Sequence, residues 1–67
     1  MDNNWSLVYT IDKLYKAEIL KEILADNGIE SFVANKLDSS FIIGEVEIYV
    51  MPDDVMKAKH LIEKFEN

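Results

Sequence analysis

Cysteine and arginine are both absent from this sequence of 67 residues. Without cysteine there can be no disulfide, no thiolate nucleophile and no zinc or iron–sulfur site built on thiolates. Without arginine there is no bidentate guanidinium, the group that proteins favour for binding phosphate and carboxylate. Glycine occurs only twice, so a Gly-rich phosphate loop is missing as well. We therefore expect a protein with no metal and no cofactor.

Positive charge is scarce in the sequence. Seven lysines stand against 13 acidic residues, which gives a formal net charge of −6. Nucleic acids and anionic membrane surfaces both attract basic faces, so this balance argues against either as a partner. No apolar run approaches the roughly 20 residues that cross a bilayer, and the segment Met1–Asn4 lacks the basic start of a signal peptide. We expect a cytoplasmic protein.

Apolar periodicity divides the chain into five segments in the order β-α-β-β-α. A helix is predicted over Lys13–Asn27, with Asp12 as its N-cap and Asn27-Gly28 as its stop signal. A second helix is predicted to open at Pro52-Asp53-Asp54. The three predicted strands are Trp5–Ile11, Ile29–Asn35 and Glu45–Met51, with residues 36–44 as a connection.

These five segments predict one α+β domain over residues 1–67. A right-handed crossover makes the first two strands parallel, and the third fits between them as an antiparallel neighbour. The expected architecture is a ferredoxin-like two-layer sandwich, with a three-stranded sheet in the order 1-3-2 and both helices on one face. The first strand is then an open edge, and open edges recruit further strands unless they are blunted.

A core pattern and one Gly-Ile junction extend from about residue 6 to residue 63. The residues that form this pattern are Val8-Tyr9-Thr10, Lys13-Leu14-Tyr15-Lys16-Ala17-Glu18, Leu20, Leu24, Gly28-Ile29-Glu30-Ser31, Gly44, Val46 to Val50, Asp53-Asp54 and Ala58. In these residues the sequence resembles a small bacterial family of unknown function labelled "putative prokaryotic signal-transducing protein".

That resemblance implies a ferredoxin-like fold related in shape to the nitrogen-regulatory PII proteins, and a regulatory role. Some relatives carry a Cys-rich tail that could bind zinc, whereas this sequence reaches Asn67 without cysteine, so we expect no metal role. The long nucleotide-binding loop of PII proteins is also absent, and nucleotide binding is not implied.

Few residues could take part in catalysis or bind a metal, and each of them has an ordinary structural explanation. His60 is the only histidine and falls outside the apolar stripe of its helix, as a solvated side chain would. Asp53 and Asp54 suit a helix N-terminus better than a cation site. Glu45 and Glu47 share one face of their strand, where solvated carboxylates are more common than an acid–base pair. We therefore expect that the protein is not an enzyme.

Two apolar features favour an interaction surface. The run at residues 41–43 either extends the core or forms an exposed docking patch. Tyr49 and Met51 alternate with core positions and face away from the helices, with Phe32 beside them. The first strand adds to this face either Trp5, Leu7 and Tyr9 or Ser6, Val8 and Thr10. The candidate interface residues are Trp5, Tyr9, Phe32, Phe41, Ile42, Ile43, Tyr49 and Met51.

The leading functional hypothesis is a non-enzymatic interaction or regulatory module. It either self-associates, as a dimer for example, or pairs with another protein through the first strand's edge, the open sheet face or the 36–44 loop. The alternative is a sensor that binds a small metabolite in a dimer cleft near residues 36–44.

Overall fold

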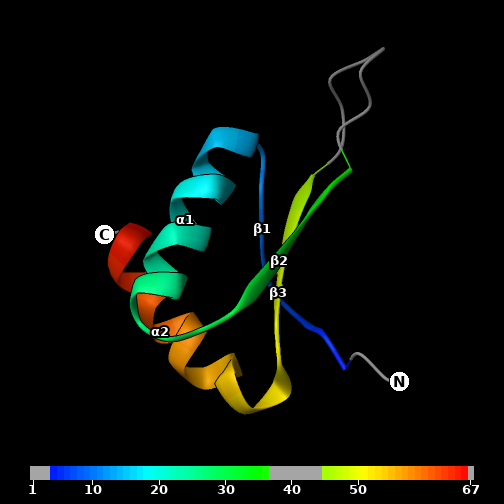
Figure 1. Ribbon diagram of the computed structural model, residues 1–67. Coiled ribbons are helices and arrows are strands. Elements are labelled where there is room, and N and C mark those ends of the chain that lie inside the picture. Colours follow the sequence, from blue (N-terminus) through cyan, green and yellow to red (C-terminus); the bar gives the residue numbers. More distant parts are fainter. Residues whose placement is uncertain (1–3, 37–44, 67) are drawn as a thin grey trace.

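The computed structural model describes residues 4–36 and 45–66 (Figure 1). The predicted order of elements is confirmed, with a short 3₁₀ turn added before the last helix. The elements are β1 (Ser6–Ile11), α1 (Leu14–Asp26), β2 (Ser31–Asn35), β3 (Val46–Val50), η1 (Pro52–Asp54) and α2 (Val55–Glu66).

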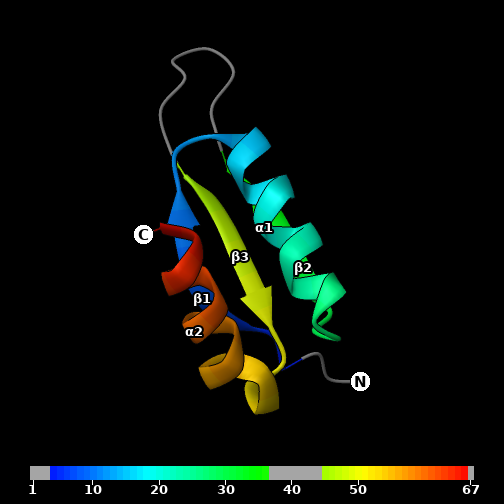
Figure 2. The ribbon, with the colours of Figure 1, turned by 90° about the vertical axis from the view of Figure 1, so that its left-hand side faces the viewer.

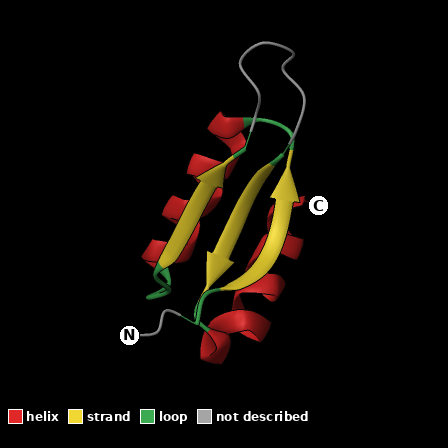
Figure 3. Cartoon of the chain, turned by 90° about the vertical axis from the view of Figure 1, so that its right-hand side faces the viewer, coloured by secondary structure: helices red, strands yellow, loops and turns green. Residues whose placement is uncertain are grey.

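The three strands form one sheet in the order β1-β3-β2, and β3 is antiparallel to both neighbours. Both helices lie side by side on one face of this sheet, α1 against β2 and α2 against β1 (Figure 2). Among the described residues, no helix lies on the opposite face (Figure 3). The chain therefore has the predicted α+β, ferredoxin-like fold.

The core lies between the helices and the inner face of the sheet. β3 contributes alternate residues that are fully buried, Val46, Ile48 and Val50, as expected for a central strand with one covered face. The helices add residues at helical spacing from their inner faces. The remaining core residues are Val8, Ala17, Leu20, Leu24, Ile29, Ala58 and Ile62.

The C-terminal end of α1 is closed as the sequence predicts. Gly28 adopts a φ of 78°, the left-handed conformation that glycine enters without steric cost. Its N–H donates to the carbonyl of Ala25 at 3.0 Å, and the N–H of Ile29 donates to that of Leu24 at 2.9 Å. These two bonds form a Schellman motif, and the buried Ile29 and Leu24 supply its usual apolar contact.

The helix N-termini differ from the prediction by a few residues. Lys13, not Asp12, is the N-cap of α1, and it makes no side-chain capping bond, so the prediction of an Asp12 cap was wrong. α2 begins at Val55, because Pro52–Asp54 forms a 3₁₀ turn in which the Asp54 N–H donates to the Met51 carbonyl at 2.9 Å. Asp53 and Asp54 still occupy the first turn of this helical segment.

β1 contains a β-bulge, which the sequence did not predict. Leu7 pairs with Tyr49 and Tyr9 pairs with Ile48, so Val8 is an extra residue between two consecutive partners. Tyr9 consequently joins the helix side of the sheet with Ile48, and Leu7 joins Tyr49 on the other side. Neither of the two alternating patterns expected for this strand is therefore complete.

Within the described residues, neither helix combines the length and apolar character that a membrane crossing requires.

Candidate functional site

The helix-free side of the sheet, here called the open face, carries a row of large apolar side chains. The strand register places Leu7, Tyr49 and Phe32 next to one another across β1, β3 and β2. Leu7 is 48% exposed and Phe32 51% exposed, although both are paired with β3 in the sheet. Thr10, Glu47 and Ala34 form the next row of the same face. Figure 3 shows this side of the sheet without helical cover.

Three aromatic rings lie together on the open face. The ring centroids of Trp5 and Phe32 are 5.9 Å apart, and those of Phe32 and Tyr49 are 6.2 Å apart. Both pairs are tilted, a common arrangement for packed aromatic side chains. A hollow of about 260 Å³ lies among them, lined also by Ala34 and Lys36. The open face thus presents an aromatic surface with one cation at its border.

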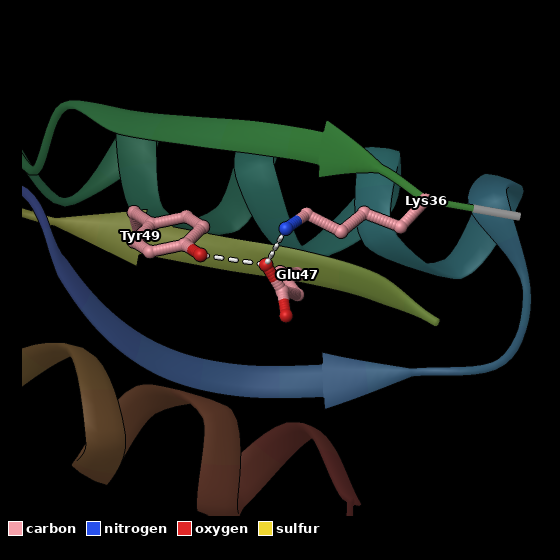
Figure 4. Close-up of polar contacts among 3 residues, drawn as sticks. All are labelled: Lys36, Glu47 and Tyr49. Carbon is pink, nitrogen blue, oxygen red and sulfur yellow. Dashed lines mark hydrogen bonds and ion pairs between the residues drawn. The ribbon is translucent and has the colours of Figure 1, made fainter. Parts of the chain in front are cut away.

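A polar chain fixes one end of this aromatic cluster (Figure 4). The Tyr49 hydroxyl donates a hydrogen bond to Oε1 of Glu47 at 2.6 Å. The same oxygen lies 3.4 Å from Nζ of Lys36, which follows β2. The Glu47 side chain is only 18% exposed, while that of Lys36 is 61% exposed. These contacts hold the Tyr49 ring in one orientation on the sheet.

The same contacts shift two ionisation equilibria. The hydrogen bond from Tyr49 lowers the pKa of Glu47, and the charge of Lys36 lowers it further, against an opposing effect of partial burial. The bond to Glu47 raises the pKa of Tyr49, with smaller contributions from partial burial and the carboxylate charge. At neutral pH the carboxylate is charged and the phenol is protonated, as the hydrogen bond requires.

The structure brings some of the candidate interface residues together and separates others. Trp5, Phe32 and Tyr49 form the aromatic cluster, as the sequence suggested. Tyr9 is instead on the helix side, half-buried and packed against the core, because the bulge shifts it there. Met51 is half-buried at the end of β3. The run Phe41-Ile42-Ile43 lies outside the described residues, so its assignment to core or interface stays a prediction.

A second surface feature, which sequence reasoning missed, is a groove along the outer side of β1 and α2. This β1–α2 groove has a volume of about 730 Å³. Val8 and Tyr9 line it from the strand, and from the helix it receives Met56, which is 85% exposed. The β1–α2 groove could not be predicted without knowledge of the bulge, because a regularly alternating strand would place Val8 and Tyr9 on opposite sides of the sheet.

Of the residues that the sequence singled out for possible catalysis, His60 and Glu45 are exposed and are not members of the aromatic cluster. His60 is exposed on α2 and lines the β1–α2 groove. Glu45 is exposed just before β3, whereas Glu47 is engaged by Tyr49 and Lys36. Across the described ranges, no group of three or more metal-ligating side chains comes together.

The sequence analysis also missed the Glu47–Tyr49 hydrogen bond and the Lys36 ion pair. The spacing of Glu47 and Tyr49 could have indicated their contact, since residues two apart on a strand point to the same face. The pairing with Lys36 depends on the register between β2 and β3, which no local pattern specifies.

Comparison with known families matches residues 5–66 to the family described as "Putative prokaryotic signal transducing protein". The family suggested by the sequence is therefore confirmed, and its description names a signalling role without a partner, ligand or reaction. Searches among curated proteins and among solved structures gave no match to this chain.

Proposed function

We propose, since the chain belongs to the family described as "Putative prokaryotic signal transducing protein", that it is a non-enzymatic cytoplasmic signalling module that docks a protein partner through its open face. The observation that carries this proposal is the row of Leu7, Tyr49 and Phe32 on a sheet face that no helix of the described residues covers. Single exposed apolar residues are ordinary on protein surfaces, whereas contiguous apolar patches mark sites of interaction.

The composition of the open face supports a protein as the occupant. Trp and Tyr are enriched among the residues that contribute most to binding between proteins, because they bury large areas with few rotatable bonds. The net charge of −6 disfavours nucleic acid, the other common ligand of aromatic sheet faces. A polar rim is present in Lys36, Glu47 and Thr10, and such a rim is typical of protein interfaces.

The Glu47–Tyr49 hydrogen bond supports the proposal in a second way. Association loses affinity when side chains must be ordered on binding. Tyr49 is already held by Glu47 at 2.6 Å, and Glu47 by Lys36, so this part of the surface needs little further ordering. The arrangement uses Glu47 as a positioning group for the ring of Tyr49, and its lowered pKa keeps it charged in that role.

Site-specific photo-crosslinking tests the proposal. Phe32 is replaced by p-benzoylphenylalanine, and the cells that make the protein are irradiated. We expect a discrete adduct with one protein chain, because Phe32 is 51% exposed and its ring packs with those of both Trp5 and Tyr49 in the aromatic cluster. The matched control is the same replacement at Tyr15, which is 62% exposed on α1 and outside the cluster. The adduct from position 32 should also be lost when Trp5→Ala is added.

Equal labelling from positions 15 and 32, or no adduct from position 32, would contradict docking at the open face. An adduct with a second copy of the chain would identify the partner as the protein itself. The unfolding free energy of each variant, measured in urea, establishes that the variant is folded.

A small-metabolite sensor is the second candidate, favoured by the hollow beside Lys36. Its volume of about 260 Å³ is just below the range of single-chain ligand sites, so a second chain would be needed to enclose a ligand. The aromatic lining suits a planar ring, and Lys36 suits a carboxylate. A thermal-shift screen of aromatic carboxylic acids tests this candidate, since a ligand that binds the folded state raises Tm. Phe32→Ala should abolish any such shift.

A further inference from the structure

The outer side of β1 is an unpaired strand edge. In the order β1-β3-β2, β1 hydrogen-bonds only with β3, and within residues 4–36 and 45–66 no strand lies on its other side. The backbone groups along such an edge are complementary to one kind of occupant, an extended chain. β1 also carries no charged residue from Ser6 to Ile11, so a second uncharged strand can approach it without repulsion.

The β1–α2 groove supplies space beside this edge. The bulge turns two consecutive residues, Val8 and Tyr9, to the helix side, and both line the groove. Met56 at the N-terminal end of α2 is 85% exposed and borders the same groove. A strand added to β1 would cover apolar surface of Tyr9 and Met56, in addition to pairing its backbone.

Charged side chains of opposite sign line the groove wall, with a cation nearer the start of α2 and the acids nearer its end. Lys59 lies in the N-terminal half of α2, and Glu63 and Glu66 lie in its C-terminal half. If two copies of α2 face each other in antiparallel orientation, the cation of each lies toward the acids of the other. A two-fold axis between two antiparallel β1 strands produces that orientation, because α2 and β1 are fixed to each other by contacts within one chain.

We infer that the β1–α2 groove is the contact between two copies of this chain, paired antiparallel through β1 around a two-fold axis. The surface is separate from the open face, and the inference goes beyond the proposed docking of a partner there. The pairing joins two three-stranded sheets into one sheet of six strands, with all helices on one side. Both open faces then lie on the opposite side, and the dimer presents two docking surfaces in one plane.

Charge exchange between two variants tests this inference. The first variant carries Lys59→Glu, and the second carries Glu63→Lys with Glu66→Lys. Each alone places like charges opposite each other across the axis, and we expect the dimer Kd measured by sedimentation equilibrium to rise about tenfold or more. In an equimolar mixture the acidic wall of one chain meets the basic wall of the other. We expect a heterodimer with a Kd close to that of the unchanged protein.

Two control variants and one further measurement make the outcome decisive. Lys21→Glu changes the net charge by the same amount as Lys59→Glu, but on the exposed side of α1, and should leave the dimer Kd unchanged. Phe32→Ala removes an aromatic ring from the open face and should also leave it unchanged, so failure of the proposed docking surface is distinguishable from failure of this one. Amide hydrogen exchange should show protection in β1 that increases with protein concentration.

A protein that stays monomeric at millimolar concentration overturns the inference. So does a dimer that is unaffected by Lys59→Glu, or one that is lost in Phe32→Ala, since the contact then lies elsewhere. A mixture of folded variants that remains monomeric overturns the antiparallel two-fold arrangement. Circular dichroism of each variant verifies that the exposed substitutions leave the fold intact.

Discussion

At the scale of single residues, Gly28 determines how α1 ends and where β2 begins. Its left-handed backbone allows the two hydrogen bonds that return the chain toward the sheet and bury Ile29. A β-carbon on Gly28 would meet no atom within 4 Å, so the requirement for glycine comes from the backbone alone. The stop signal Asn27-Gly28 could be predicted from sequence because it depends on this local preference.

The first prediction concerns that residue. Gly28→Ala should lower the free energy of unfolding by about 1–2 kcal/mol, the cost of a left-handed conformation for an ordinary residue. Gly28→Asn should lower it less, because asparagine tolerates this region better. Urea denaturation of the two variants measures both values. Equal losses for alanine and asparagine would show that the backbone conformation is not the cause.

The Glu47–Tyr49 pair gives a prediction about pH. The folded-state pKa of Glu47 is lowered, so its contribution to stability is complete above the ordinary glutamate pKa of about 4.3 and is lost as pH falls through the lowered value. The pKa of Tyr49 is raised, so its contribution is complete below about 10 and is lost as pH rises through the raised value.

Carboxyl NMR titration measures the lowered pKa of Glu47. In Tyr49→Phe the Glu47 midpoint should move up toward its ordinary range, because the largest cause of the lowering is removed. Lys36→Met should move it in the same direction, because both the charge of Lys36 and its hydrogen bond lower this pKa. An unchanged midpoint in Tyr49→Phe would mean that the hydrogen bond does not persist in solution.

At the scale of elements, β3 separates two chemically different sides of the sheet. Its residues Val46, Ile48 and Val50 are fully buried beneath the helices, and Glu47 and Tyr49 lie half-buried on the open face. The clean alternation of this strand made its two faces predictable from sequence. The faces of β1 were not predictable, because the bulge at Val8 interrupts the alternation and is specified by tertiary pairing.

Two substitutions on neighbouring strands should therefore differ in how far they lower the free energy of unfolding. Ile48→Ala should lower the free energy of unfolding by about 2–5 kcal/mol, through lost burial and the cavity left behind. Phe32→Ala should lower it by about 1 kcal/mol or less, since the ring is 51% exposed and packs with the aromatic rings of Trp5 and Tyr49 on the open face. Thermal or urea unfolding compares the two. A loss from Phe32→Ala as large as that from Ile48→Ala would show that the open face is structural.

At the scale of the whole molecule, the fold followed from sequence because few arrangements are open to so short a chain. Two helical and three strand segments, joined by a right-handed crossover, leave the order β1-β3-β2 with both helices on one face. The aromatic cluster could be foreseen in part, since Phe32 and Tyr49 alternate with core residues. The β1–α2 groove and the polar contacts of Glu47 could not, because they depend on register and on the bulge.

The bulge has a consequence for how the length of this chain can vary among its relatives. Ser6 pairs with Val50, Leu7 with Tyr49, and Tyr9 with Ile48, so Val8 is a spacer that the ladder does not need for its register. Loss of that one position would leave every other side chain of β1 on its present side of the sheet. Loss of Tyr9 would have the same result, because Val8 could then stand opposite Ile48, whereas loss of Leu7 or Thr10 would move an inner residue to the outer side. A single-residue gap in the first strand is thus tolerable at residue 8 or 9, at the expense of one side chain packed in or against the core.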